Sequence, residues 1–141
     1  MSKQNVEVAK RAIAAFNARE VEAFADLTTP DFEWSPSMSA IENEKFFGRE
    51  GIHKYFDSLR NAWERFQVVP DRFRDQADRV LALGRLEGRG RSSGATVDSS
   101  LGMVFTFRGG MISRIDGYLD HAEALNALGL AADGGSPQAT Q

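Results

Sequence analysis

The segment from Val104 to Leu130 reads VFTFRGGMISRIDGYLDHAEALNALGL and is the most informative part of the sequence. Two alternating segments flank Gly109-Gly110, a dipeptide that suits a type I′ turn because both central residues of that turn have positive φ. A short helical pattern follows over 122–128, and Gly129 stands where glycine commonly ends a helix. The stretch therefore predicts a β-hairpin and a closing helix.

A two-residue turn also fixes which residues of the two strands face each other. Counting outward predicts these pairs: Arg108 with Met111, Phe107 with Ile112, Phe105 with Arg114, Met103 with Asp116 and Leu101 with Tyr118. Because side chains alternate between faces, all of these except Arg108 and Met111 would share one face. An apolar wall that carries an acid, a base and a phenol is typical of a small-molecule pocket.

Apolar periodicity assigns the rest of the chain. It predicts helices at 3–17, 20–28 and about 50–66, a short strand at 32–34, an irregular segment at 35–48, and strands at 67–75, 78–90, 95–107 and 111–119. Pro70 places the first of these four strands at a sheet edge or at a bulge. We expect one α+β domain over 1–130, a cone-shaped barrel whose helices pack across a strongly curved antiparallel sheet and enclose a pocket. Residues 131–141 should form a disordered tail.

The composition argues against several classes of partner and functional site. The chain has 141 residues, a net charge of −3, no cysteine and two histidines. The charge argues against nucleic acid and anionic membranes as partners, and the lack of cysteine excludes thiol nucleophiles and thiolate metal sites. No metal-ligand spacing, nucleotide-binding loop or apolar spanning run occurs, so we expect no metal, no cofactor and no membrane. The absence of a signal-peptide pattern favours the cytoplasm.

Several loose motifs carry a family resemblance. They are Phe16-Asn17-Ala18-Arg19 before Val21-Glu22-Ala23-Phe24, then Asp31-Phe32-Glu33-Trp34, Gly48-Arg49-Glu50-Gly51-Ile52, the hairpin 105–112, and Tyr118-Leu119-Asp120 before Glu123-Ala124-Leu125. With the order of elements, they make the chain similar to the SnoaL-like branch of the NTF2-like superfamily, which contains polyketide cyclases and is related to ketosteroid isomerase. The resemblance implies a homodimer through the outer face of the sheet. That fold hosts both enzymes and non-catalytic binders.

Asp116 is the first catalytic candidate. Desolvation in an apolar pocket would raise its pKa and make it a proton carrier near neutral pH. In the cyclases and isomerases that the chain resembles, an acidic residue in the cavity moves a proton on carbon next to a carbonyl. The alternative is a solvated ion pair with Arg114, two residues away.

Asp120 is the second candidate. The resemblance aligns it with the acidic residue that the cyclases use as acid and base. The alternative is structural, because Asp120-His121-Ala122-Glu123 has the form of a capping box with Asp120 as the N-cap.

The other candidates would bind substrate. Arg114 would clamp an anion, and Tyr118 would donate a hydrogen bond. Trp34 lies on the early strand that borders the pocket in the family, with a core or dimer anchor as its alternative. Met103 and Phe105 are expected beside the charged residues or in the core. His53 lies beside the apolar stripe of the long helix, where it is either solvated or a pocket acid or base.

Two functions follow. One is a cofactor-independent cyclase or isomerase that uses a pocket carboxylate for proton transfer on a small hydrophobic carbonyl compound. The other is a non-catalytic dimeric module that binds a small hydrophobic molecule. The resemblance implies that the small residues of the opposite hairpin face pack on a second copy, the alternative being that they pack within the chain or stay solvated: Gly102, Val104, Thr106, Ser113, Ile115 and Gly117.

Overall fold

The computed structural model describes residues 2–38 and 44–130. The expected disordered tail at 131–141 lies outside the described residues. The elements are α1 (Ser2–Ala18), α2 (Val21–Ala25), β1 (Thr28–Ser35), β2 (Phe46–Phe47), α3 (Gly48–Ala62), β3 (Trp63–Gln76), β4 (Arg79–Gly90), β5 (Thr96–Arg108), β6 (Met111–Tyr118) and α4 (His121–Ala127).

The predicted α+β class is confirmed, with one correction to the sheet. The strands form a six-stranded sheet in the order β2-β1-β6-β5-β4-β3. All neighbours are antiparallel except β1 and β6, which pair in parallel, so the curved sheet is mixed and does not close into a barrel. Parallel neighbours need a long connection, and here the chain between β1 and β6 supplies it.

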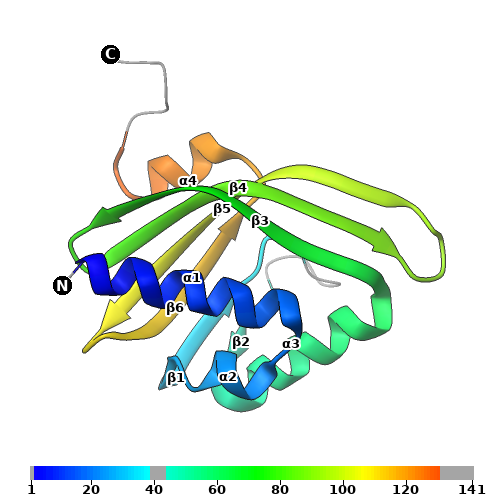
Figure 1. Cartoon of the computed structure of the whole chain (residues 1–141), viewed down its shortest axis with the longest axis horizontal. Coiled ribbons are helices and arrows are strands. Elements are labelled where there is room, and N and C mark those ends of the chain that lie inside the picture. Colours follow the sequence, from blue (N-terminus) through cyan, green and yellow to red (C-terminus); the bar gives the residue numbers. More distant parts are fainter. Residues whose placement is uncertain (1, 39–43, 131–141) are drawn as a thin grey trace.

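The two faces of the sheet carry different layers. Helices α1, α2 and α3 lie across the concave face, while α4 lies on the opposite face, which we call the outer face (Figure 1). The main core lies under α1–α3, and a smaller apolar cluster joins α4 to the outer-face side chains Leu81, Leu83 and Val104. The sheet therefore buries apolar side chains on both faces.

Asn17 fastens the end of α1 to the edge strand β3. Its carboxamide donates a hydrogen bond to the carbonyl of Val68 and accepts one from the Val68 amide, each at 2.8 Å. The side chain thus pairs with the strand as a neighbouring backbone would. Further along β3, the ladder is irregular between Pro70 and Arg72, so the prediction of an edge strand disrupted at Pro70 is confirmed.

Several element boundaries differ from the predictions. The long helix ends at Ala62, and Trp63 already has the extended angles φ −124° and ψ 133°. Trp63 and Phe66 therefore belong to β3. A three-residue spacing would put them on opposite faces of a regular strand, but the ladder shifts register between Trp63 and Arg65. Their rings lie 5.0 Å apart, and Phe66 packs on Phe16. The early strand is longer than predicted, beginning at Thr28 and containing Pro30, and β2 forms inside the segment expected to be irregular.

The predicted hairpin register agrees with the structure only next to the turn. Gly109 and Gly110 have φ of 62° and 83°, and the pairs Arg108 with Met111 and Phe107 with Ile112 are confirmed. Beyond them the register shifts by one residue at a bulge, where the Ser113 hydroxyl donates to the Thr106 carbonyl at 3.2 Å. The observed pairs are Thr106 with Arg114, Val104 with Asp116 and Gly102 with Tyr118, so the three predicted pairs beyond the bulge are wrong.

That single extra residue changes which side chains reach the concave face. A one-residue shift moves every following side chain to the other face of a strand. Ile115 and Gly117 turn toward the concave face, and Arg114, Asp116 and Tyr118 turn toward the outer face. The expectation of an acid, a base and a phenol on the same wall as Met103 and Phe105 is therefore wrong.

Candidate functional site

The concave face holds a small cavity between the sheet and the helices. Its volume is about 30 Å³, which is room for about two water molecules. The lining residues come from α1, β1 and the segment after it, α3, and β3–β6: Phe16, Trp34, Pro36, Ser37, Tyr55, Phe66, Val68, Leu86, Leu101, Met103 and Gly117. A second void of about 10 Å³ continues deeper along the same face.

Aromatic packing builds the wall of this cavity. The Trp34 ring stacks on Phe24 with centroids 4.9 Å apart and meets the edge of Tyr55 at 4.7 Å. Phe16 contacts both Trp34 and Phe66 edge to face. Such offset and edge-on geometries are the favourable ones for aromatic pairs.

Polar groups at the cavity are few. The Tyr55 hydroxyl donates to the carbonyl of Met38 at 2.8 Å, and burial raises the pKa of this phenol, which is only 3% exposed. Ser37 lies opposite Gly117, where an added Cβ would stand 2.6 Å from the Ser37 amide nitrogen. Gly117 therefore lets the segment after β1 approach the sheet. None of the described lining residues is Asp, Glu or His.

Three of the predicted binding residues do lie on the concave face. Trp34 lines both voids and is 2% exposed. Met103 also lines both, and Phe105 lines the deeper one. The placement of Met103 and Phe105 follows from strand alternation on β5, whereas the position of Trp34 was implied by the family resemblance.

Arg114, Asp116 and Tyr118 lie on the outer face, away from the cavity. The Nε of Arg114 contacts Oδ2 of Asp116 at 2.8 Å, and its Nη1 lies 3.5 Å from Oε2 of Glu33. The Asp116 carboxylate raises the pKa of Arg114, and Lys45 adds a second contact to Glu33 at 3.1 Å. This outer-face ionic group, Glu33, Lys45, Arg114 and Asp116, matches the ion-pair alternative for Asp116.

Tyr118 is half-buried beside this group and packs against the α4 cluster. Burial raises the pKa of its phenol, and the neighbouring Asp116 adds to that effect. The structure thus brings Arg114, Asp116 and Tyr118 together, as expected, but on the face opposite the cavity.

Asp120 caps α4. Its Oδ1 accepts a hydrogen bond from the Ala122 amide at 2.8 Å, and its backbone is extended, as an N-cap requires. This observation fits the structural alternative for Asp120. Neither void on the concave face includes it among its lining residues.

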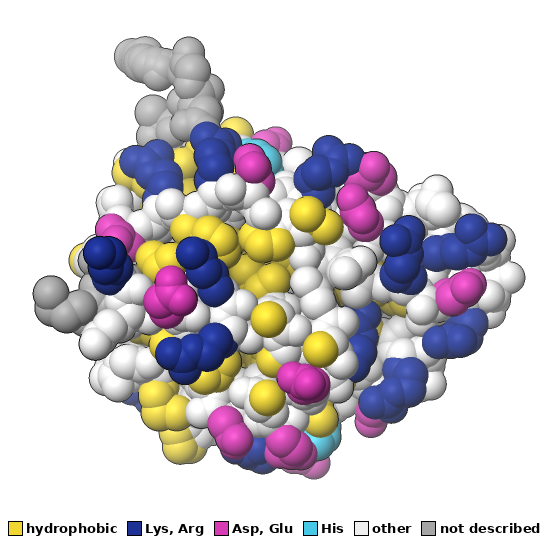
Figure 2. Space-filling view, viewed as in Figure 1, with side chains coloured by type: hydrophobic (Ala, Val, Ile, Leu, Met, Phe, Trp, Pro, Cys, Tyr) yellow, Lys and Arg dark blue, Asp and Glu magenta, His cyan; other side chains and the backbone are white. Residues whose placement is uncertain are grey.

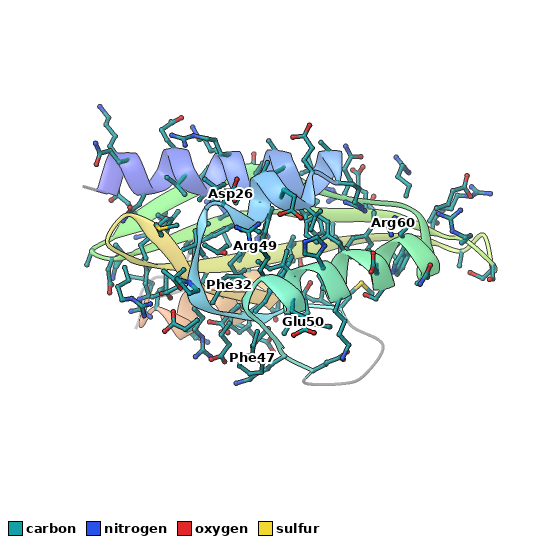
Figure 3. The ribbon with its side chains drawn as sticks, turned by 90° about the horizontal axis from the view of Figure 1, so that it is seen from below. Asp26, Phe32, Phe47, Arg49, Glu50 and Arg60 are labelled. Atoms are coloured by element: carbon teal, nitrogen blue, oxygen red, sulfur yellow. The ribbon has the colours of Figure 1, made fainter. Side chains whose placement is uncertain are left out.

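His53 belongs to an exposed clasp between α2 and α3. Its Nε2 lies 2.8 Å from a Glu22 carboxylate oxygen, and Arg49 contacts both Glu22 at 2.5 Å and Asp26 at 2.8 Å. Figure 3 shows Arg49 and Asp26 directed toward each other at this junction. The structure therefore does not bring His53 to the cavity.

The sequence reasoning missed the main polar group of the cavity, Tyr55. It lies on the apolar stripe of α3 with Ile52, Phe56 and Leu59, so periodicity alone treated it as core. Its hydroxyl was the available signal, because a buried phenol needs a hydrogen-bond partner and often faces a polar opening.

Three further observations concern metal ions, surface charge and membranes. Among residues 2–38 and 44–130, no three His, Asp or Glu side chains are placed to hold a metal ion. Lys and Arg side chains on the face shown in Figure 2 are interspersed with Asp and Glu, without a continuous basic surface. In the described part of the chain, no helix is both long and apolar enough to cross a membrane.

Comparison with known families decides the classification. The SnoaL-like domain family matches residues 9–115, which is more than half of the chain. The chain belongs to the SnoaL-like domain family. No curated protein sequence matches this SnoaL-like chain.

Solved structures agree with this SnoaL-like assignment at the level of the fold. TerC, co-crystallised with polyporic acid, has a TM-score of 0.74 and 25% identity over 89% of this chain and 97% of its own. A putative polyketide cyclase from Pseudomonas putida has a TM-score of 0.71 and 20% identity over 82% and 91%. A protein with a ketosteroid isomerase-like fold from Catenulispora acidiphila, in complex with trimethylamine, has 0.72 and 19% over 92% and 97%.

Proposed function

We propose that this SnoaL-like chain binds a small, planar, carbonyl-bearing aromatic compound on the concave face. One observation carries the proposal: the described lining is aromatic and aliphatic, and its buried polar group is the Tyr55 hydroxyl, which donates to the Met38 carbonyl in the unliganded chain and still has lone pairs to accept a hydrogen bond from a ligand. Such a lining holds an apolar body by packing and orients it by one or two polar contacts. The polyporic acid bound to TerC, whose fold is similar, supports this ligand class.

Binding requires the wall to move. The unliganded cavity of about 30 Å³ is far below the several hundred Å³ of typical ligand pockets. Met103 is the wall residue best suited to move, since an unbranched thioether changes shape at low cost. It stands opposite Gly117, so its displacement opens the cavity toward Ser37.

The test is calorimetric titration with polyporic acid and simpler planar aromatic ketones. Met103→Phe should reduce affinity about tenfold or more, because a rigid ring fills the space that the ligand needs. Met111→Phe is the matched control, since Met111 is 38% exposed at the hairpin and lines neither void. Equal affinities for the two variants, or no saturable binding by any of the compounds, would contradict the proposal.

The second candidate is an enzyme of the cyclase or isomerase type. A protonated phenol is suited to stabilise an enolate oxygen, and Tyr55 keeps its proton because burial raises its pKa. This role requires the hydroxyl to turn from the Met38 carbonyl to the enolate, since it has a single proton to donate. No carboxylate lies among the described lining residues, so water would have to carry the proton on and off carbon. We expect deuterium uptake next to the carbonyl of a bound ketone, reduced about a hundredfold in Tyr55→Phe. Exchange at the uncatalysed rate would leave only the binding function.

We also propose that the chain forms a two-fold dimer through the part of the outer face that α4 leaves uncovered. The outer-face ionic group contains two cations and two carboxylates, which suits an interface between identical surfaces. Phe47, paired with Glu33 on β1 and 59% exposed, adds an apolar contact at its margin (Figure 3).

A further inference from the structure

A polar residue occupies the first core-facing position of α1. The buried stripe of this helix runs through Asn5, Ala9, Ala12, Ile13 and Phe16. Asn5 is only 8% exposed, and no described residue makes a hydrogen bond to its carboxamide. An apolar residue would continue the stripe at that position. Among the described residues, the Asn5 carboxamide atoms are not enclosed without a partner, so this nearly buried side chain is open only toward the clefts that it lines.

Asn5 lines two adjoining clefts at the end of the molecule. Their volumes are about 460 and 540 Å³, and both are lined by Gln4, Asn5 and Gly110. The first cleft extends along α1 to Arg11, and the second reaches the turns between β3 and β4 and between β5 and β6. Figure 1 shows the start of α1 beside these two turns. The clefts share no lining residue with the concave cavity.

The α1 side of these clefts is electropositive. The first backbone N–H groups of a helix have no acceptor within the helix, and the dipole places partial positive charge there. Lys3 and Arg11 line the first cleft, and no ion pair joins either to a described carboxylate. The lining carboxylate of Glu7 lies 3.7 Å from Lys10. Asp78 lies across the second cleft, on the turn between β3 and β4.

The hairpin turn leaves space for a ligand. Gly109 and Gly110 both have positive φ, and a Cβ added to either would meet nothing within 4 Å. Their lack of side chains also keeps the cleft beside Asn5 open.

We propose that this cleft binds a small molecule through an oxyanion, either a carboxylate or a phosphate. The Asn5 carboxamide and the first-turn N–H groups donate hydrogen bonds to the oxyanion, and Lys3 and Arg11 neutralise its charge. The site is independent of the concave-face ligand.

The experiment is a titration of the ¹⁵N-labelled full chain with inorganic phosphate and, separately, with succinate, at constant ionic strength set by chloride. We expect saturable amide shifts confined to residues 3–11 and 109–110. Asn5→Leu should weaken binding about tenfold or more, as expected for a lost hydrogen bond to a charged group, while raising the melting temperature because the apolar stripe is completed. The anion that binds more tightly identifies phosphate or carboxylate as the ligand group.

A second pair of variants covers the case in which Asn5→Leu does not fold. Arg11→Gln should weaken binding several-fold, whereas Lys54→Gln on α3 makes the same change of net charge outside the cleft and should leave binding unchanged. Equal losses for these two variants would show that only general charge attracts the anion and would overturn the site. Shifts spread over the whole surface, or equally large shifts with chloride alone, would do the same.

Discussion

At the scale of single residues, Tyr55 is the group whose ionisation the fold most strongly opposes. An unfolded phenol ionises near pH 10, but burial holds the folded Tyr55 protonated to higher pH. The free energy of unfolding is therefore unaffected by this group below about pH 10 and falls as the pH rises above it. We predict that Tyr55→Phe removes most of this alkaline loss, which reaches at most about 1.4 kcal/mol per pH unit.

Urea unfolding at pH 8 and at successive values above 10 measures this slope. Tyr118→Phe is the matched control, because the chain has two tyrosines and Tyr118 is less buried. Its pKa is also raised, so the control should flatten the alkaline loss less than Tyr55→Phe. If the two variants behave alike, the burial of Tyr55 is not the cause.

Substitutions of Asp120 distinguish a helix-capping role from a role in ligand binding. The observed bond to the Ala122 amide predicts that Asp120→Ala lowers the free energy of unfolding by about 1 kcal/mol. Asp120→Asn should retain most of the stability, since asparagine is an equally good N-cap. Chemical unfolding gives the stabilities, and the affinity for the concave-face ligand should not change in either variant. A loss of ligand affinity in Asp120→Asn at wild-type stability would restore the functional interpretation.

At the scale of elements, the pattern predicted the helices and strands well because each has a regular apolar period. The hairpin turn was also predictable, since two consecutive glycines favour positive φ. The bulge was not, because it depends on one local contact, Ser113 with Thr106, that no periodicity shows. The face of each following residue was therefore assigned wrongly, and with it the position of Asp116.

Because α4 covers part of the outer face, the pattern of apolar and polar residues did not reveal which face of the sheet is concave. In β4, Val80, Leu81, Ala82 and Leu83 are all buried, because α1–α3 cover one face and α4 the other. A strand buried on both faces reads as a continuous apolar run. On β5, Val104 was assigned to a dimer surface, but α4 covers it. The sequence predicts the helix α4 but does not show on which face of the sheet it packs.

The packing of α4 leads to a prediction at Gly102. A Cβ added there would lie 2.5 Å from the Cβ of Ala124, so Gly102→Ala should displace α4 and cost about 1–3 kcal/mol. Ala124→Gly alone should cost about 1 kcal/mol through helix propensity. The double variant should recover part of the Gly102→Ala loss, because the clash is gone. Urea unfolding of the four proteins gives the coupling energy, and strictly additive losses would contradict this contact.

At the scale of the whole molecule, the sheet separates two kinds of chemistry. The concave face carries the aromatic cavity, and the outer face carries α4 and the outer-face ionic group. Arg114, Asp116 and Tyr118 were expected in the pocket but lie on the outer face, where we propose that the chain associates. Exposed ion pairs contribute little to the stability of a monomer, so substitutions in this group should test the proposed dimer without loss of the fold.

The final prediction concerns this association. In a two-fold interface the same surface is used twice, so one reversed charge acts twice. Arg114→Glu places a third carboxylate beside Glu33 and Asp116, and it should shift the dimer to monomer at micromolar concentration. Phe47→Ser should weaken the dimer without changing the charge.

Light scattering across a concentration series measures the mass, with Arg60→Glu on α3 as the control that reverses a charge elsewhere. Because the cavity opens on the opposite face, ligand affinity should survive in both variants. A wild-type chain that stays monomeric at all concentrations, or an unchanged dimer in Arg114→Glu, would show that the ionic group serves only its own chain.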